Sequence, residues 1–181
     1  MKQSTLIRAS VAGIAIVLAL SLSACRSGDS STGAVGATGA PSIQGGDEFC
    51  NIAVAALASA GDVTKASTDL VTAMTGNDIN ALHTASQQIL DNSTQATHFY
   101  TLGAAAANDQ ATKDAFTGLS QFVAQYSVPM GQAGVSAATV PAFTASITTL
   151  FSDPALKPLL QNAAGWAQTT STFTKQHCAI G

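Results

Sequence analysis

The chain has 181 residues, with 7 Lys+Arg against 10 Asp+Glu and a formal net charge of −3. This charge excludes the strongly basic surface that binding to a nucleic-acid backbone requires. Charged residues make up 9% of the chain and hydrophobic residues 46%, so general disorder through high charge and low hydrophobicity is excluded as well. The length suits a leader segment followed by one folded domain.

Residues 1–24 have the organisation of an export signal. Lys2 and Arg8 give a positive start, and residues 11–20 are an unbroken run of apolar residues and Gly. A membrane-spanning helix needs about 20 apolar residues, so this run is too short to be one. It has the length of the central region of a secretory signal peptide, and we expect this segment to direct export.

The residues that follow the apolar run read Leu22-Ser23-Ala24-Cys25. Here the chain resembles the precursors of bacterial lipoproteins, whose lipobox has Leu, two small residues and Cys. The resemblance implies that Cys25 receives diacylglycerol on its sulfur and becomes the mature N-terminus. Two acyl chains would hold the protein stably at the extracytoplasmic face of the cell membrane. The alternative is an ordinary secretory signal that leaves Cys25 as a free thiol.

Residues 25–46 are expected to be a lipidated Cys and a flexible tether, and residues 47–181 a helical domain. Gly, Ser, Thr and Ala dominate the tether, which shows no apolar periodicity. Its 21 residues after Cys25 would span about 25 Å on average as a flexible coil. Beyond Asp47 the hydrophobic spacing becomes helical, and proline is absent until Pro129.

Apolar residues spaced three and four positions apart predict two helices in the first half of the domain. The first runs from Asp47 to Gly76, with a kink or break possible at Gly61, and the second starts with Asn77 or Asp78 as its cap. The apolar face of the first helix comprises Phe49, Ile52, Ala56, Ala60, Val63, Ala66, Leu70 and Met74. The face of the second comprises Ile79, Leu82, Ser86, Ile89 or Leu90, Ser93, Ala96, Phe99 or Tyr100, and Gly103.

The second half of the domain is predicted to be helical too. A third helix starts after Asn108 and Asp109 and is broken at residues 128–131, where Pro129 lies. Residues 136–151 form a further helix, and the sequence at 152–154 restarts the last one. The third helix presents Ala111, Ala115, Phe116, Leu119, Phe122, Val123 and Tyr126. The last presents Leu156, Leu159, Leu160, Ala163, Ala167, Thr170 and Phe173, with Lys175 and His177 at its negative end.

Cys50 and Cys178 remain once Cys25 is lipidated, and outside the cytoplasm they can form a disulfide. Because they lie at the two ends of the domain, a bond between them favours an even number of antiparallel passes. We therefore predict an all-α, up-and-down bundle of four passes, the last one broken. Five helical segments can also be drawn, which weakens this argument. A redox or metal-binding pair is the alternative for the two cysteines, although they lack the CxxC spacing.

Few residues suggest catalysis. Glu48 is the only Glu, which excludes a ferritin-like di-iron site, and no GxSxG, P-loop, HExxH or GxGxxG motif occurs. His83 and His98 are too far apart on one helix to share a metal ion. Asp91 and His98 share a face and form either half of a metal site or a polar outer surface. We predict no enzyme, no cofactor and no metal.

The two remaining patterns concern a ligand pair and a cavity. His177 beside Cys178 is either a ligand pair or a cation at a helix C-terminus. Trp166, Tyr100, Tyr126 and the seven Phe residues either fill the core or line a cavity.

The predicted function is a membrane-anchored extracytoplasmic lipoprotein that acts as a binding or envelope interaction module. The alternative is a carrier of a small apolar ligand, lipid or haem, in the bundle core.

Overall fold

A computed structural model describes residues 46–58 and 60–178, and within these ranges every regular element is a helix. The all-α prediction is thereby confirmed. The signal segment, Cys25 and the tether up to residue 45 lie outside the described residues. The elements are α2 (Gly46–Ala58), α3 (Ala60–Gly76), α4 (Ile79–Ala106), α5 (Gln110–Phe122), the π-helix η1 (Val123–Ser127), α6 (Val128–Ser136), α7 (Val140–Phe151) and α8 (Leu156–His177).

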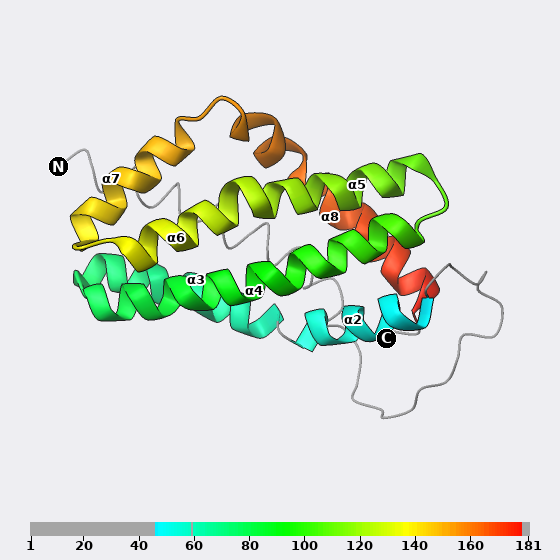
Figure 1. Ribbon diagram of the computed structural model, residues 1–181, viewed down its shortest axis with the longest axis horizontal. Helices are drawn as coiled ribbons and strands as arrows, with labels where there is room; N and C mark the ends of the chain where they lie inside the picture. The colour runs from blue at the N-terminus through cyan, green and yellow to red at the C-terminus, as the bar shows by residue number, and fades with distance from the viewer. Residues whose placement is uncertain (1–45, 59, 179–181) are drawn as a thin grey trace.

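The longest helix, α4, lies at the centre of the packing (Figure 1). It contacts α2 and α3 on one side and α5, η1 and α6 on the other. Helix α8 packs mainly on α5 and also contacts α2, whereas α7 packs on α6 and α3. The first and last described helices therefore meet at one end of the molecule, where the predicted disulfide joins Cys50 to Cys178 with their Cα atoms 5.3 Å apart.

Acidic and hydroxyl side chains cap the helices α4, α5 and α7. Asp78 caps α4, and its carboxylate accepts hydrogen bonds from the backbone N–H groups of Asn80 and Ala81. The preceding Asn77 has φ of 54°, a left-handed conformation that Asn tolerates well. Thus Asp78 is the cap and Asn77 makes the turn. Thr139 caps α7 in the same way by accepting from the N–H of Ala142.

The first predicted helix corresponds to α2 and α3, which lie on either side of residue 59. Its buried face agrees with the prediction at Phe49, Ala66 and Leu70. It is wider than predicted, because Ala53, Ser67 and Ala73 are buried too, while Ile52 and Met74 are half-buried. The extra small residues let α3 approach α4 closely.

The predicted break at Pro129 is wrong, because the chain stays helical from α5 through η1 into α6. The N–H of Val128 reaches the carbonyl of Val123, five residues earlier, which is the bonding pattern of a π-turn. Proline has no N–H and its ring crowds the carbonyl of the preceding turn. The wider π-turn just before Pro129 accommodates both features, so the helix changes its bonding instead of ending.

The helix expected over 136–151 begins later than predicted. Ser136 ends α6, Ala137 is extended, and α7 starts only at Val140 because Thr139 provides the cap. The interruption predicted at 152–154 is present, and α8 starts at Leu156 after Asp153 accepts a hydrogen bond from the N–H of Ala155.

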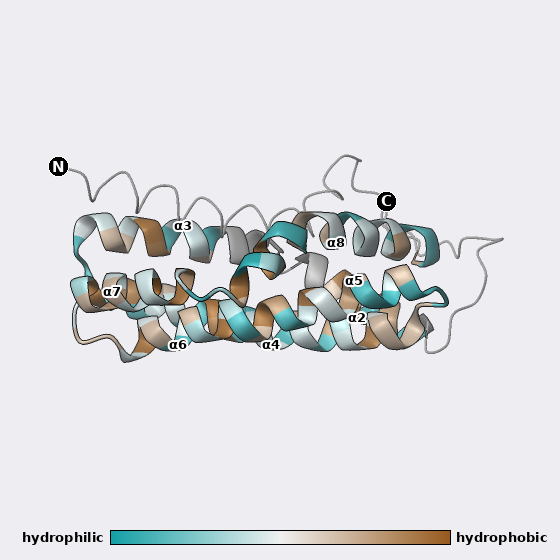
Figure 2. Cartoon of the chain, turned by 90° about the horizontal axis from the view of Figure 1, so that it is seen from above, coloured by the Kyte–Doolittle hydropathy of each residue, from teal (hydrophilic) through white to brown (hydrophobic). Residues whose placement is uncertain are grey.

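Helix α8 is rich in Thr, which has a poor intrinsic helix propensity. Its hydroxyls are nevertheless bonded within the helix: Thr172 donates to the carbonyl of Gln168 and Thr174 to that of Thr170. Thr170, Ser171 and Thr174 are buried against the rest of the molecule. Burial and local hydrogen bonding therefore outweigh the low helix propensity of these Thr residues. Figure 2 shows hydrophobic and hydrophilic residues interspersed along the helices.

Four phenylalanines fill the core at the disulfide end. Phe49, Phe99, Phe116 and Phe173 come from α2, α4, α5 and α8, and the ring centroids of Phe49 lie 5.4 Å, 5.9 Å and 5.8 Å from those of the other three. Gly103 lies directly against the ring of Phe116, where any side chain would overlap it. These aromatic residues therefore pack on one another at this end of the core.

Candidate functional site

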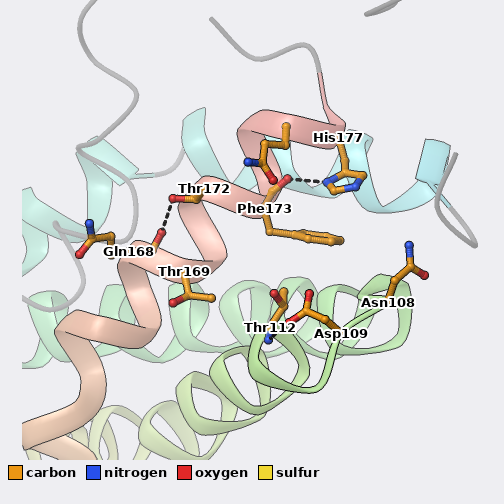
Figure 3. Close-up of a pocket in the computed structure, with 9 residues that line it drawn as sticks. Asn108, Asp109, Thr112, Gln168, Thr169, Thr172, Phe173 and His177 are labelled. Carbon is orange, nitrogen blue, oxygen red and sulfur yellow. Dashed lines mark hydrogen bonds between the residues drawn. The ribbon is translucent and has the colours of Figure 1, made fainter. Parts of the chain in front are cut away.

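An open cleft of about 470 Å³ lies at the disulfide end, between the start of α5 and the last turns of α8 (Figure 3). This volume falls in the range of small-molecule sites, roughly 300–1,000 Å³. The α5 side contributes Asn108, Asp109 and Thr112. The α8 side contributes Gln168, Thr169, Thr172, Phe173, Gln176 and His177.

The α8 side of the cleft is one face of a helix. Its six residues recur in pairs every four positions, a spacing that brings them onto one stripe. Thr169 donates its hydroxyl proton to the carbonyl of Gly165, and Thr172 donates to Gln168. Both Thr oxygens keep lone pairs that can accept a hydrogen bond from a ligand.

The α5 side is built around the N-cap of that helix. The Asp109 carboxylate accepts a hydrogen bond of 2.9 Å from the N–H of Thr112. The backbone N–H and the side chain of Thr112 both stabilise the charged carboxylate and so lower the pKa of Asp109. The cleft therefore contains one negative charge at neutral pH, and among the described residues neither Lys nor Arg lines it.

Two aromatic rings stack on each other at the end of the cleft nearest the disulfide. The ring of Phe173 is 5% exposed, and the His177 ring stacks on it with centroids 4.3 Å apart. Nδ1 of His177 donates to the carbonyl oxygen of Phe173 at 2.9 Å, which fixes the orientation of the imidazole. His177 precedes the disulfide-bonded Cys178, so the cross-link holds this end of the cleft in place.

Three exposed side-chain amides remain free in the cleft. Asn108, Gln168 and Gln176 make no side-chain hydrogen bond with any other described residue. Each amide offers two donors and one acceptor oxygen. These groups are the unused hydrogen-bonding capacity of the site. The sequence predicted Asn108 only as part of a turn, and Gln168 and Gln176 belong to no motif, so none of the three was predicted to bind a ligand.

The other two histidines, His83 and His98, lie outside the cleft. Nε2 of His83 lies 2.8 Å from the carbonyl oxygen of Ala137, and His98 is exposed on α4. The carboxylate of Asp91 accepts a hydrogen bond from Gln87. In the ranges 46–58 and 60–178, no three His, Cys, Asp or Glu residues come together in a group that could hold a metal ion. Of the histidines, only His177 lines the cleft.

Two other open grooves, of about 370 Å³ and 610 Å³, flank the turn between α7 and α8 and share Ser152, Asp153 and Pro154. Neither gathers free amides as the cleft does. Within the described part of the chain, no helix combines the length and apolar character that crossing a bilayer requires. Comparison of the chain with protein-family models, with curated proteins and with solved structures gives no match.

Proposed function

We propose that this chain is a lipoprotein anchored through Cys25 at the extracytoplasmic face of the cell membrane, where it acts as a binding module of the envelope. The order of export segment, lipobox, tether and helical domain supports the location. The cleft supports the binding role, because three unpaired amides and a carboxylate line an open hollow of suitable size. This cleft is the observation that carries the proposal, which is one of binding without catalysis or a cofactor.

We further propose that the domain is an up-and-down bundle of four passes. The passes would be α2 with α3, α4, α5 with η1 and α6, and a broken fourth pass of α7 and α8. The packing of α4 against both neighbours and of α8 against α5 supports this. In that arrangement the cleft lies at the end of the domain nearest the proposed tether, which would span about 25 Å on average as a flexible coil.

The alternative, a carrier of an apolar ligand in the bundle core, is opposed by the packing at the disulfide end. The packed rings of Phe49, Phe99, Phe116 and Phe173 occupy the space that such a ligand would need. Binding a lipid or haem there would have to displace at least one of these rings from the others. The open, polar cleft requires no such rearrangement.

The anchor is tested by expressing the full chain with Cys25→Ser and separating membranes from soluble material. We expect the variant to leave the membrane fraction, while a Ser27→Ala control stays with it. Mass analysis of the wild-type mature protein should show an acylated N-terminal Cys25. Membrane-bound Cys25→Ser after washing at high salt would contradict anchoring at this sulfur.

The cleft is tested by the retention of the full chain on purified cell-envelope material. We expect Asn108→Ala and Gln168→Ala to weaken retention, because both remove a free amide from an exposed position. Gln88→Ala, which removes an exposed amide on α4 outside the cleft, is the matched control. Equal retention of all four proteins would show that the cleft is not the binding surface.

A further inference from the structure

The chemistry of the cleft restricts the class of ligand that can bind there. An anionic ligand finds no Lys or Arg in the lining and meets the charge of Asp109 instead. A metal ion finds this single carboxylate and no group of ligands among the described residues. A wholly apolar ligand would cover the amides of Asn108, Gln168 and Gln176 without bonding them, which is unfavourable.

A neutral polyhydroxylated ligand fits what remains. An amide presents a donor and an acceptor side by side, and neighbouring hydroxyl groups on a sugar ring offer the matching acceptor and donor. The free lone pairs of Asp109 can accept from a hydroxyl as well, in a charge-assisted bond. Asn108 and Asp109 come from the α5 side and Gln168 and Gln176 from two turns of α8, so a saccharide of several rings is needed to reach all of these groups.

The stacked rings of His177 and Phe173 also suit a saccharide ligand. A sugar ring has a face of C–H bonds that packs on aromatic surface, and His177 stacked on Phe173 provides rings at the end of the cleft. The imidazole is only half-buried, so part of the stack is accessible from the cleft. Polar groups along two sides and aromatic rings at one end distinguish the cleft from a merely polar hollow.

We propose that the cleft binds a neutral saccharide, with Asn108, Gln168 and Gln176 bonding its hydroxyl groups and His177 packing on one of its rings. This assignment rests on the proposed function, in which the cleft is the binding surface. Two sources could supply such a group near a membrane: a neutral cell-wall polysaccharide or the headgroup of a neutral glycolipid. Both have the same chemistry, and the experiment separates them.

The test is direct binding of the full chain to defined probes. Maltotetraose, chitotetraose and mannotetraose represent soluble glycans, and vesicles of phosphatidylcholine with digalactosyl diacylglycerol represent the lipid source. Vesicles of phosphatidylcholine alone are the blank, and the protein for the vesicle arm is the full-length Cys25→Ser variant. A capped neutral tetrapeptide tests the other neutral, hydrogen-bonding ligand class, a peptide chain.

We expect at least one saccharide probe to bind, and Asn108→Ala, Gln168→Ala and Gln176→Ala each to weaken it by about 3- to 10-fold. His177→Ala should weaken it too, and Gln88→Ala should not. Failure of every saccharide to bind up to about 10 mM would overturn the proposal, as would binding that the cleft variants leave unchanged or tetrapeptide binding alone.

The outcome is separable from that of the proposed function. If the cleft variants lose retention on envelope material but no saccharide binds, the cleft is the binding surface and the ligand class is wrong. If a saccharide binds and neither its affinity nor envelope retention responds to the cleft variants, the cleft is not the binding surface. The proposed function of the cleft and the proposed saccharide site are then both wrong. Circular dichroism of each variant confirms that the helices are retained, since the three amides are exposed.

Discussion

Cys178 caps the C-terminus of α8 and is disulfide-bonded to Cys50 near the start of α2, across a separation of 128 residues. The bond therefore ties together the first and last helices of the described domain, next to the cleft. A cross-link over so long a loop can lower the entropy of the unfolded chain by an amount worth up to about 5 kcal/mol.

We expect the double variant Cys50→Ser, Cys178→Ser to unfold at a lower denaturant concentration, with a loss of unfolding free energy of up to about 5 kcal/mol. It should keep its helical circular dichroism, because the Phe49 cluster and the α4 core are buried independently of the bond. The wild type without reductant should show no free thiol at either position after denaturation. An unchanged unfolding midpoint after reduction would contradict a stabilising role.

The starts of two helices and the cystine pair could be predicted from local sequence, because each depends on a few neighbouring residues or on a count. Asp78 and Asp109 are capping residues directly before apolar periodicity, and only two cysteines follow Cys25 in the chain. The continuation of the helix through Pro129 could not be predicted from the sequence, because a π-turn and a helix end have the same sequence signal there.

The cleft could not be predicted for a different reason. Asn108 and Gln168 are sixty positions apart and line the same cleft only because α8 packs on α5. Their amides carry no motif, and the α8 side of the cleft lies next to the buried stripe that the periodicity identifies. The sequence suggests that His177 is either one of a ligand pair with Cys178 or a cation at a helix end, and neither interpretation predicts its stacking on Phe173 in the cleft.

The contact between α6 and α4 gives a second prediction. Gly134 lies so close to Ser86 that an added Cβ would overlap the serine side chain and come within 3.4 Å of Phe143. We expect Gly134→Ala to lower the unfolding free energy by about 1–3 kcal/mol, because the fully buried Ser86 would have to shift.

Gly165→Ala is the matched control for that change. An added Cβ at Gly165 meets nothing within 4 Å, and the residue lies inside α8. This variant should gain up to about 1 kcal/mol through helix propensity. Urea unfolding of both proteins measures the difference, and equal effects of the two substitutions would show that α6 and α4 are not in close contact.

Asp109 leads to a prediction on pH. Thr112 lowers the pKa of this carboxyl below its usual 3.8, so the ionised form stabilises the folded state. That contribution is fully present above the unfolded pKa and is lost as the pH falls through the lower folded pKa. Asp109→Ala should therefore be less stable than the wild type at neutral pH, and the difference should shrink in acid. Asp109→Asn, which keeps an acceptor at the cap, should lie between the two, whereas a pH-independent difference would contradict this role.

Tyr126 lies in η1 and is buried between the rings of Phe122 and Phe151, with centroid distances of 5.0 Å and 5.4 Å. Its hydroxyl finds no hydrogen-bond partner among the described residues, and burial raises the pKa of the phenol. A buried hydroxyl without a partner lowers stability, so its removal by Tyr126→Phe should leave the unfolding free energy unchanged or raise it. Tyr126→Ala should cost about 3–5 kcal/mol, because the ring contacts are lost as well. Denaturant unfolding of the two variants separates the hydroxyl from the ring. A loss of about 1 kcal/mol or more in Tyr126→Phe would mean that the hydroxyl is bonded after all, through a group such as an internal water molecule.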